Sequence, residues 1–153
     1  MELYRSIIEE LKTWKRNPGR KPLILKGARQ TGKTWSLEYF GRTEFKYTVK
    51  FNFDKDHSIH EIFKMTKEPS RIISQLSLLT DYPILPNETL LIFDEIQECN
   101  SALNSLKYFY EDSPEYVGVA AGSLLGVALT KGESFPVGKL IFSIYIPSHS
   151  KSF

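Results

Sequence analysis

The sequence predicts an α/β fold, in which a mainly parallel sheet carries helices on both faces. Three observations point to it: short, continuously apolar runs, amphipathic stretches at helical spacing between them, and a chain of 153 residues. A continuously apolar run indicates a strand that is covered on both faces. A chain of this length forms one domain that buries about two-thirds of its unfolded surface. We therefore expect a single domain of three layers.

The N-terminal stretch has the pattern of an amphipathic helix. Apolar residues recur at helical spacing through residues 2–16, and an Asn-Pro-Gly sequence at 17–19 ends the pattern. The apolar face of this helix packs either on the domain's own sheet or on a partner subunit. We therefore divide the chain into an N-terminal amphipathic helix at 1–20, a core at 21–146 and an irregular tail at 147–153.

Strands are expected at residues 22–26, 45–53, 89–93, 116–121 and 140–146. The second of these alternates strictly between apolar and polar residues, so one of its faces is buried and the other is solvated. Because the other strands are uniformly apolar, the alternating strand is expected at an edge of the sheet. The helices expected between the strands lie at 35–40 with an end near Gly41, from a capping box at Ser58 and Glu61, at 70–79, and from a cap at Asn100 and Ser101.

A glycine-rich loop follows the first strand and matches Gly-x-x-x-x-Gly-Lys-Thr, the pattern of a phosphate-binding loop. Its residues are Gly27, Ala28, Arg29, Gln30, Thr31, Gly32, Lys33 and Thr34. The backbone N–H groups of such a loop, with the start of the next helix, form a positively polarised nest that fits a β-phosphate. Glycines permit the positive φ angles and the close approach that this nest needs. The alternative is a glycine-rich turn without a ligand.

Two side chains of the loop have separate roles in this interpretation. Lys33 is expected to reach the β- and γ-phosphates of a nucleotide, and the Thr34 hydroxyl to ligate Mg²⁺, which prefers oxygen. Trp35 follows directly and is expected next to the nucleotide. The loop residues from Gly27 onward, together with Trp35, are therefore the candidate nucleotide contacts.

Two carboxylates, Asp94 and Glu95, stand at the end of the third strand. In a parallel α/β sheet, ligands bind at the carboxyl ends of the strands, and the phosphate-binding loop leaves the first strand at that same edge. We expect Asp94 to hold Mg²⁺ opposite Thr34, and Glu95 to polarise a water in line with the γ-phosphate. The alternative for the pair is a solvated turn or a helix cap.

Ser123 follows the fourth strand in the same way. If that strand lies between the first strand and the one that ends at Asp94, the Ser123 hydroxyl emerges beside Glu95. It then either holds the attacking water and reports on the γ-phosphate, or caps the segment that follows it. Ser123 joins Glu95 and Lys33 as a candidate catalytic residue.

The composition limits the partners. Twenty basic and 18 acidic residues leave a net charge of +2, and no block of Lys and Arg indicates nucleic-acid binding. Cys99 is the single cysteine of the chain, so no disulfide framework is expected. No apolar run is long enough to span a bilayer, and charged residues interrupt any signal peptide. These features predict a cytoplasmic setting.

Four motifs give the chain a family resemblance. They are Lys26–Thr34, Phe93–Gln97, Ala121–Ser123 and Ser134–Lys139. Together they resemble the AAA-type P-loop ATPase domain at the N-terminus of bacterial and archaeal DUF4143-containing proteins. The resemblance implies a P-loop NTPase three-layer sandwich with strand order 5-1-4-3-2, ATP and Mg²⁺ as cofactors, and the site roles given above. A homo-oligomer or another protein partner is consistent with it.

The C-terminus departs from the family pattern. Family members continue through a segment resembling Pro-Leu-Thr-Phe-Lys-Glu-Phe into a helical lid and a further domain. A coding sequence for that segment, read one nucleotide late, gives the Ser-His-Ser-Lys-Ser found at 148–152. We therefore expect a frameshifted or truncated product without the lid or an arginine for a neighbour's γ-phosphate, and hence impaired hydrolysis.

Three functions remain open at this stage. The first is an ATP-binding domain that is by ancestry a Mg²⁺-dependent ATPase. The second is a nucleotide-binding switch, or a remnant of one, that binds without hydrolysis. The third is a small-molecule P-loop kinase, for which no acceptor site or arginine-rich lid is found and to which a Glu directly after the metal-binding Asp is less suited.

Overall fold

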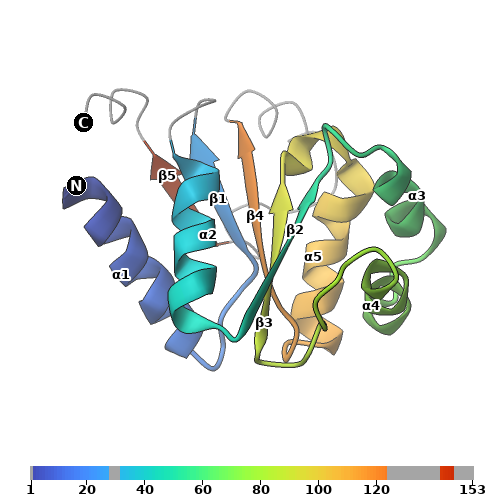
Figure 1. The fold of residues 1–153 in the computed structure, drawn as a ribbon, viewed down its shortest axis with the longest axis horizontal. Coiled ribbons are helices and arrows are strands. Elements are labelled where there is room, and N and C mark those ends of the chain that lie inside the picture. Colours follow the sequence, from blue (N-terminus) through green and yellow to red (C-terminus); the bar gives the residue numbers. More distant parts are fainter. Residues whose placement is uncertain (1, 28–31, 124–141, 147–153) are drawn as a thin grey trace.

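The structure, a computed structural model, describes residues 2–27, 32–123 and 142–146 (Figure 1). Its strands are β1 (Leu23–Gly27), β2 (Tyr47–Asn52), β3 (Thr89–Asp94), β4 (Val117–Ser123) and β5 (Phe142–Ile146). Its helices are α1 (Glu2–Arg16), α2 (Lys33–Glu44), α3 (Ser58–Met65), α4 (Pro69–Ser77) and α5 (Asn100–Asp112), and a short 3₁₀ helix, η1, covers Ile96–Glu98. The tail at 147–153 lies outside the described residues.

The described strands form one parallel sheet in the order β2-β3-β4-β1-β5. This is the expected order read from the opposite edge, so the α/β prediction is confirmed. β2 is an edge strand, as its alternation indicated: Val49 and Phe51 are buried and Lys50 is exposed. Because β4 lies between β1 and β3, the carboxyl ends of these three strands are neighbours at the top of the sheet in Figure 1.

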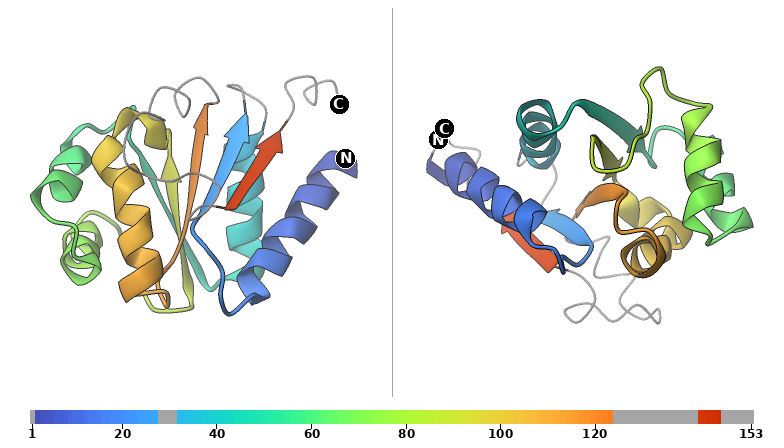
Figure 2. Two further views of the ribbon diagram at one scale, coloured as in Figure 1. Left: turned by 180° about the vertical axis from the view of Figure 1, so that it is seen from behind. Right: turned by 90° about the horizontal axis from the view of Figure 1, so that it is seen from below.

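Each face of the sheet carries its own hydrophobic core. Successive residues of β3 point to opposite faces, as the two-residue period of a strand requires. Leu90 and Ile92 join the core with α1 and α2, whereas Leu91 and Phe93 join the core with α3, α4 and α5. Full burial of such a side chain contributes roughly 1.5–3 kcal/mol. Figures 1 and 2 show the resulting three layers, with α2 on one face of the sheet and α5 on the other.

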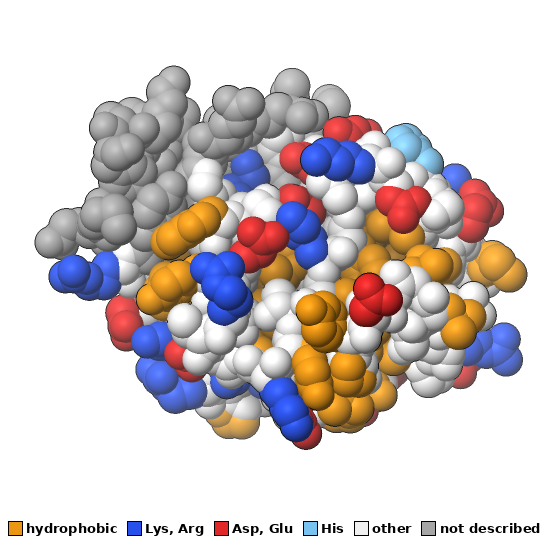
Figure 3. Space-filling view, viewed as in Figure 1, with side chains coloured by type: hydrophobic (Ala, Val, Ile, Leu, Met, Phe, Trp, Pro, Cys, Tyr) orange, Lys and Arg blue, Asp and Glu red, His pale blue; other side chains and the backbone are white. Residues whose placement is uncertain are grey.

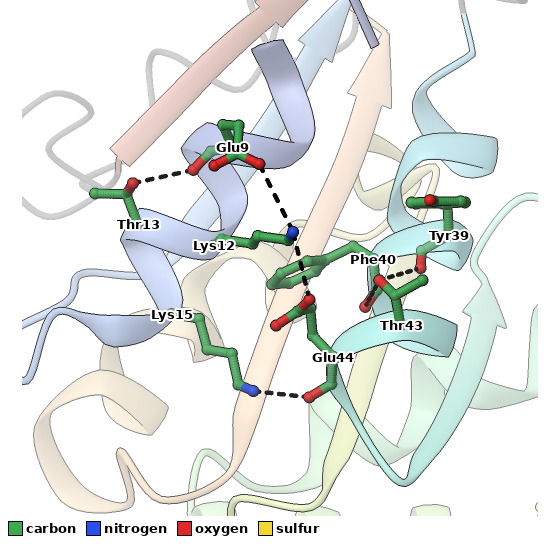
Figure 4. Close-up of polar contacts among 8 residues, drawn as sticks. All are labelled: Glu9, Lys12, Thr13, Lys15, Tyr39, Phe40, Thr43 and Glu44. Carbon is green, nitrogen blue, oxygen red and sulfur yellow. Dashed lines mark hydrogen bonds and ion pairs between the residues drawn. The ribbon is translucent and has the colours of Figure 1, made fainter. Parts of the chain in front are cut away.

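Helix α1 packs on its own domain. Leu11 and Trp14 are buried in the core that α2 and the sheet also form. Polar contacts hold the two helices together beside this core (Figure 4): Lys12 Nζ lies 3.8 Å from a Glu44 carboxylate oxygen, and Lys15 Nζ donates to the Glu44 carbonyl at 2.7 Å. Of the two alternatives for the amphipathic helix, the structure therefore selects the domain's own core.

The predicted helix caps at Ser58 and Asn100 are wrong, although both helices form. The N-cap of α3 is His57, and the Asp56 carboxylate accepts hydrogen bonds from the Ser58 backbone N–H at 3.1 Å and from its hydroxyl at 2.5 Å. The Asp56 carboxylate thus takes the Ser58 N–H that Glu61 would have accepted in a capping box, and it also engages the hydroxyl that would have acted as the cap. Asn100 lies inside α5, whose N-cap is Cys99.

An exposed apolar surface lies beyond the end of α4. That helix ends at Ser77, not at Leu79 as expected, and Leu79 is 53% exposed rather than buried. Tyr82 is also exposed, and its ring lies 6.2 Å from the ring of Tyr47, the first residue of β2. Figure 3 shows apolar side chains gathered on this part of the surface. This exposed apolar surface therefore lies at the amino ends of the strands, away from their carboxyl ends.

Gly41 lies inside α2 and does not end it. The helix continues to Glu44, and Gly41 is a position where α2 lies close to Thr48 of β2. A Cβ atom at position 41 would lie 2.7 Å from Cγ2 and 3.0 Å from Cβ of Thr48. The glycine therefore serves a close helix–strand contact.

We expect Gly41→Ala to lower the free energy of unfolding by about 1–3 kcal/mol, because the added methyl overlaps Thr48. This cost opposes the roughly 1 kcal/mol by which alanine normally favours a helix over glycine. Urea denaturation of the variant and the parent chain measures the difference. Gly19→Ala is the matched control, since its Cβ would lie 3.8 Å from its nearest neighbour. A Gly41→Ala chain as stable as the parent would contradict the assignment.

Candidate functional site

The carboxyl ends of the strands bring the predicted site residues to one edge of the sheet. Gly27 at the end of β1 pairs in register with Ser123 at the end of β4. Asp94 ends β3, which is the other neighbour of β4. Gly122 and Ser123 belong to β4 itself, so this strand ends two residues later than expected. The sequence therefore places Gly27, Asp94 and Ser123 correctly on three adjacent strands.

The exit of the phosphate-binding loop has the geometry that the motif requires. Gly32 has φ 91°, a left-handed conformation that favours glycine, and it is the N-cap of α2. The carbonyl of Gly32 accepts the Ser36 N–H at 2.9 Å, which closes the first turn of the helix. Gly32 has no side chain with which to cap this helix end. The first N–H groups of α2 and the positive end of its dipole are thus directed toward the loop.

Lys33 begins α2 and is buried, with 6% of its surface exposed. Its Nζ donates to the carbonyl of Gly27 at 3.2 Å, so the side chain folds back across the start of the loop. A buried ammonium group is costly unless it is hydrogen-bonded or near an anion. The side chain therefore holds a positive charge next to the loop. Residues 28–31 of the predicted site lie outside the described residues.

Thr34 and Asp94 are in direct contact. The Thr34 hydroxyl donates to Asp94 Oδ2 at 2.9 Å, and the Glu95 backbone N–H donates to Oδ1 at 3.0 Å. This contact reaches across the position of β4, because α2 starts beside β1 and packs over β4, β3 and β2. The two residues that were expected to share a metal are therefore neighbours.

Asp94 is held in an environment that disfavours its charge. Burial raises the pKa of its carboxyl group above the ordinary value of 3.8, and the neighbouring charge of Glu95 acts in the same direction. The hydrogen bond from Thr34 acts in the opposite direction. A cation bound at Asp94 would remove the unfavourable effect of burying the carboxylate.

The oxygen atoms of Thr34 and Asp94 fit a hard divalent cation. Mg²⁺ is bound in proteins by one or two carboxylates together with phosphate oxygens and waters, not by a dedicated cage of side chains. The hydroxyl and the desolvated carboxylate are thus the kind of partial site that a nucleotide's phosphates complete.

Glu95 has an unusual backbone. Its φ of 53° and ψ of 48° are left-handed, which is uncommon for a residue other than glycine. Such conformations cost on the order of 1 kcal/mol and cluster at functional sites. The Asp94 carboxylate accepts the N–H of Glu95, and the carbonyl of Glu95 accepts the Glu98 N–H at 3.1 Å. Hydrogen bonds at both its N–H and its carbonyl thus fix the backbone turn that carries the Glu95 side chain.

Gln97 joins Glu95 to Ser123. Its Nε2 donates to Glu95 Oε1 at 2.8 Å, and its Oε1 accepts the Ser123 backbone N–H at 3.3 Å. The sequence analysis placed Ser123 beside Glu95 but assigned no role to Gln97. Its position two residues after a strand-end glutamate was the available signal. The described site therefore contains one polar residue that the pattern-based analysis missed.

Trp35 lies at the border of the candidate site. Its side chain is 44% exposed and stacks on Tyr39 one turn later in α2, with ring centroids 5.4 Å apart. Both rings line a hollow of about 410 Å³ between α1 and α2. The structure therefore directs Trp35 toward α1, and its contact with a nucleotide stays a prediction.

A family model described as an AAA domain matches residues 19–151 of the chain. The chain belongs to this AAA domain family. The match spans most of the chain and confirms the resemblance to AAA-type ATPase domains. It supports the prediction of an ATP-binding domain of the AAA type.

Two solved structures share the fold of this AAA domain. PCH-2 of C. elegans aligns with a TM-score of 0.51 and 13% identity, over 95% of this chain and 43% of that chain. The ORC1 protein of Aeropyrum pernix, solved in complex with DNA, aligns with a TM-score of 0.53 and 17% identity, over 94% of this chain and 44% of that chain. The AAA domain thus spans less than half of either protein. A comparison with curated proteins finds no match.

Within the described part of the AAA domain, no helix is both long enough and apolar enough to cross a membrane.

We expect Asp94→Asn to raise the melting temperature of the metal-free AAA domain at pH 7. Because the pKa of Asp94 is higher in the folded state than in the unfolded state, the ionised carboxylate subtracts stability at neutral pH. This loss of stability disappears as the pH falls through the range between the raised pKa of Asp94 and 3.8. The stability difference between variant and parent should therefore narrow towards pH 4.

Thermal unfolding followed by circular dichroism at pH 7 and at pH 4, without Mg²⁺, measures this difference. Asp81→Asn makes the same change of charge at an exposed position and should alter stability by less than about 0.5 kcal/mol. An Asp94→Asn chain that is less stable than the parent at pH 7 would show that the ionised Asp94 carboxylate does not lower the stability of the fold.

Proposed function

We propose that this AAA domain binds ATP together with Mg²⁺ and hydrolyses its β–γ phosphoanhydride bond. The observation that carries the proposal is the 2.9 Å hydrogen bond from Thr34 to Asp94. It brings the start of the loop helix and the end of β3 within the span of one small cation. Mg²⁺, when bound, neutralises charge on the β- and γ-phosphates.

The loop binds and orients the triphosphate. The backbone N–H groups at the start of α2, together with the helix dipole, attract the phosphate oxygens. Lys33 supplies a buried positive charge, and its amine already lies over the loop at the carbonyl of Gly27. Moving from that carbonyl to a phosphate replaces a neutral acceptor by a charged one, which makes the hydrogen bond stronger.

Glu95 acts as the base in this proposal. Water attacks the γ-phosphorus, the bond from that phosphorus to the β–γ bridging oxygen breaks, and ADP leaves with the bonding electron pair. Glu95 accepts the proton that the water loses and passes it to the released phosphate or to solvent. The half-buried position of Glu95 beside Asp94 and its fixed backbone turn support this role.

The transition state gains further charge stabilisation if an arginine from a second subunit enters the site. Such an arginine is worth roughly 10³–10⁵ in rate in related phosphoryl-transfer enzymes. A homo-oligomer is therefore the partner that best fits the proposal. The rival function is nucleotide binding without turnover. ATP binding and phosphate release, measured side by side over a range of protein concentrations, separate the two functions.

We expect Lys33→Ala to weaken ATP binding by about 10- to 100-fold while the fold remains intact, because a charge-assisted hydrogen bond to phosphate contributes roughly 1.5–3 kcal/mol. Isothermal titration calorimetry with Mg²⁺ and ATP measures the affinity, and circular dichroism checks the fold. Lys64→Ala removes the same charge from the exposed face of α3 and should leave the affinity unchanged. Equal affinities of the Lys33→Ala variant and the parent would remove the loop from the site.

Glu95→Gln should keep ATP affinity within about threefold and lower the turnover rate by about 10²- to 10⁴-fold, since the amide cannot take the proton from water. Phosphate release under saturating ATP measures the rate. Glu98→Gln, an equal change at an exposed position in η1, serves as the matched control. If the Glu95→Gln variant hydrolysed ATP at the parent rate, Glu95 would not be the base.

A further inference from the structure

The side chain of Gln97 connects two elements of the site that the backbone leaves apart. The end of β4 and the turn at Glu95 belong to separate elements. Among the described contacts, the side-chain amide of Gln97 links them. The amide accepts from Ser123 on one side and donates to Glu95 on the other. One rigid, planar group therefore sets the distance between a β4 backbone N–H and a Glu95 carboxylate oxygen.

The two partners determine the orientation of the amide. A glutamate carboxylate accepts hydrogen bonds, and a backbone N–H donates them, so Nε2 must face Glu95 and Oε1 must face Ser123. A flipped amide would place its oxygen against the carboxylate and its N–H₂ group against another N–H. Glutamine thus fits both neighbours in one arrangement only.

The backbone around Gln97 is held in place by a local hydrogen bond and by a buried neighbour. It lies in η1, whose first turn is closed by the hydrogen bond from the Glu98 N–H to the Glu95 carbonyl at 3.1 Å. Ile96, the residue before it, is completely buried in the core under α5. The backbone that carries Gln97 is therefore fixed to the turn at Glu95 and to the core.

We propose that Gln97 is a positioning residue: it holds the Glu95 carboxylate at a set place relative to the end of β4 and transmits a displacement of Ser123 to Glu95. The proposal rests on the function of Glu95 proposed above. Ser123 pairs in register with Gly27, the first residue of the phosphate-binding loop. A displacement of the end of β4 when the γ-phosphate binds or leaves is thus conveyed to the base through the Gln97 side chain.

The kinetic test replaces Gln97 by Met, which has a similar volume but neither the donor nor the acceptor. We expect kcat to fall by about 10- to 100-fold, as for a misplaced catalytic group, with KM for ATP within about twofold of the parent. Gln97→Glu keeps the shape and replaces the donor by an oxygen, so it should show the same loss. Gln75→Met, at an exposed position of α4, is the matched control.

If Glu95→Gln abolishes turnover and both Gln97 variants keep the parent kcat, the positioning role is wrong and the proposed function stands. If the parent chain itself does not hydrolyse ATP, the hydrolytic function is wrong, and the second experiment decides the positioning role without turnover.

The second experiment is a double-mutant cycle read by NMR at the Ser123 backbone amide. Glu95→Ala should shift this amide resonance in the parent chain, because Gln97 transmits the change. The same substitution in a Gln97→Met background should leave the resonance in place, and Gln97→Leu, which also lacks both the donor and the acceptor, provides a second background if the Met variant does not fold. A Glu95→Ala shift of equal size with and without Gln97 would overturn the proposal.

Discussion

The hydrogen bond between Thr34 and Asp94 is the constraint on which the candidate site depends. It links residues 60 apart in the sequence, at the start of α2 and at the end of β3. It forms across the intervening β4, because α2 starts beside β1 and packs over the sheet towards β2. A strand order that put β1 and β3 farther apart would place the loop and the carboxylates on separate parts of the edge. The sheet topology therefore determines the chemistry that the site can perform.

The same edge concentrates groups that a protein otherwise avoids. Lys33 and Asp94 are each 6% exposed, and Glu95 has a left-handed backbone. Each of these features opposes folding when no ligand is present. The two hydrophobic cores on the faces of the sheet supply the stability that offsets these unfavourable features. A phosphate group and a divalent cation would bring charges that complement both buried side chains, as the proposed function requires.

The sequence predicts the fold well where one physical rule dominates. Uniform apolar runs identify strands covered on both faces, and the alternation around Val49 and Phe51 identifies the edge strand before the topology is known. The motif at 27–34 and the carboxylates at 94 and 95 lead to the right edge of the sheet because parallel strands end together. The strand order itself was given by the family resemblance, not by the residue pattern, because local spacing does not encode which strands are neighbours in the sheet.

Local chemistry limits the prediction elsewhere. Ser58 has the spacing of a capping box, but its backbone N–H and its hydroxyl both donate to Asp56 instead. The bridge through Gln97 depends on a contact between η1 and β4, which are 26 residues apart at the hydrogen bond to Ser123. No periodic pattern encodes such a contact, so an isolated glutamine is recognised as part of a site only once the elements are in place.

The close approach of α2 to β2 constrains how this sequence can change over evolutionary time. Thr48 occupies the space that any side chain at position 41 would need. The two positions are in contact, so the effects of substituting them are not additive. Threonine at 48 must first give way to a smaller residue before glycine at 41 can be replaced without loss. Substitution at 48 followed by substitution at 41 is therefore open to selection. The reverse order is closed, although both orders lead to the same pair of residues.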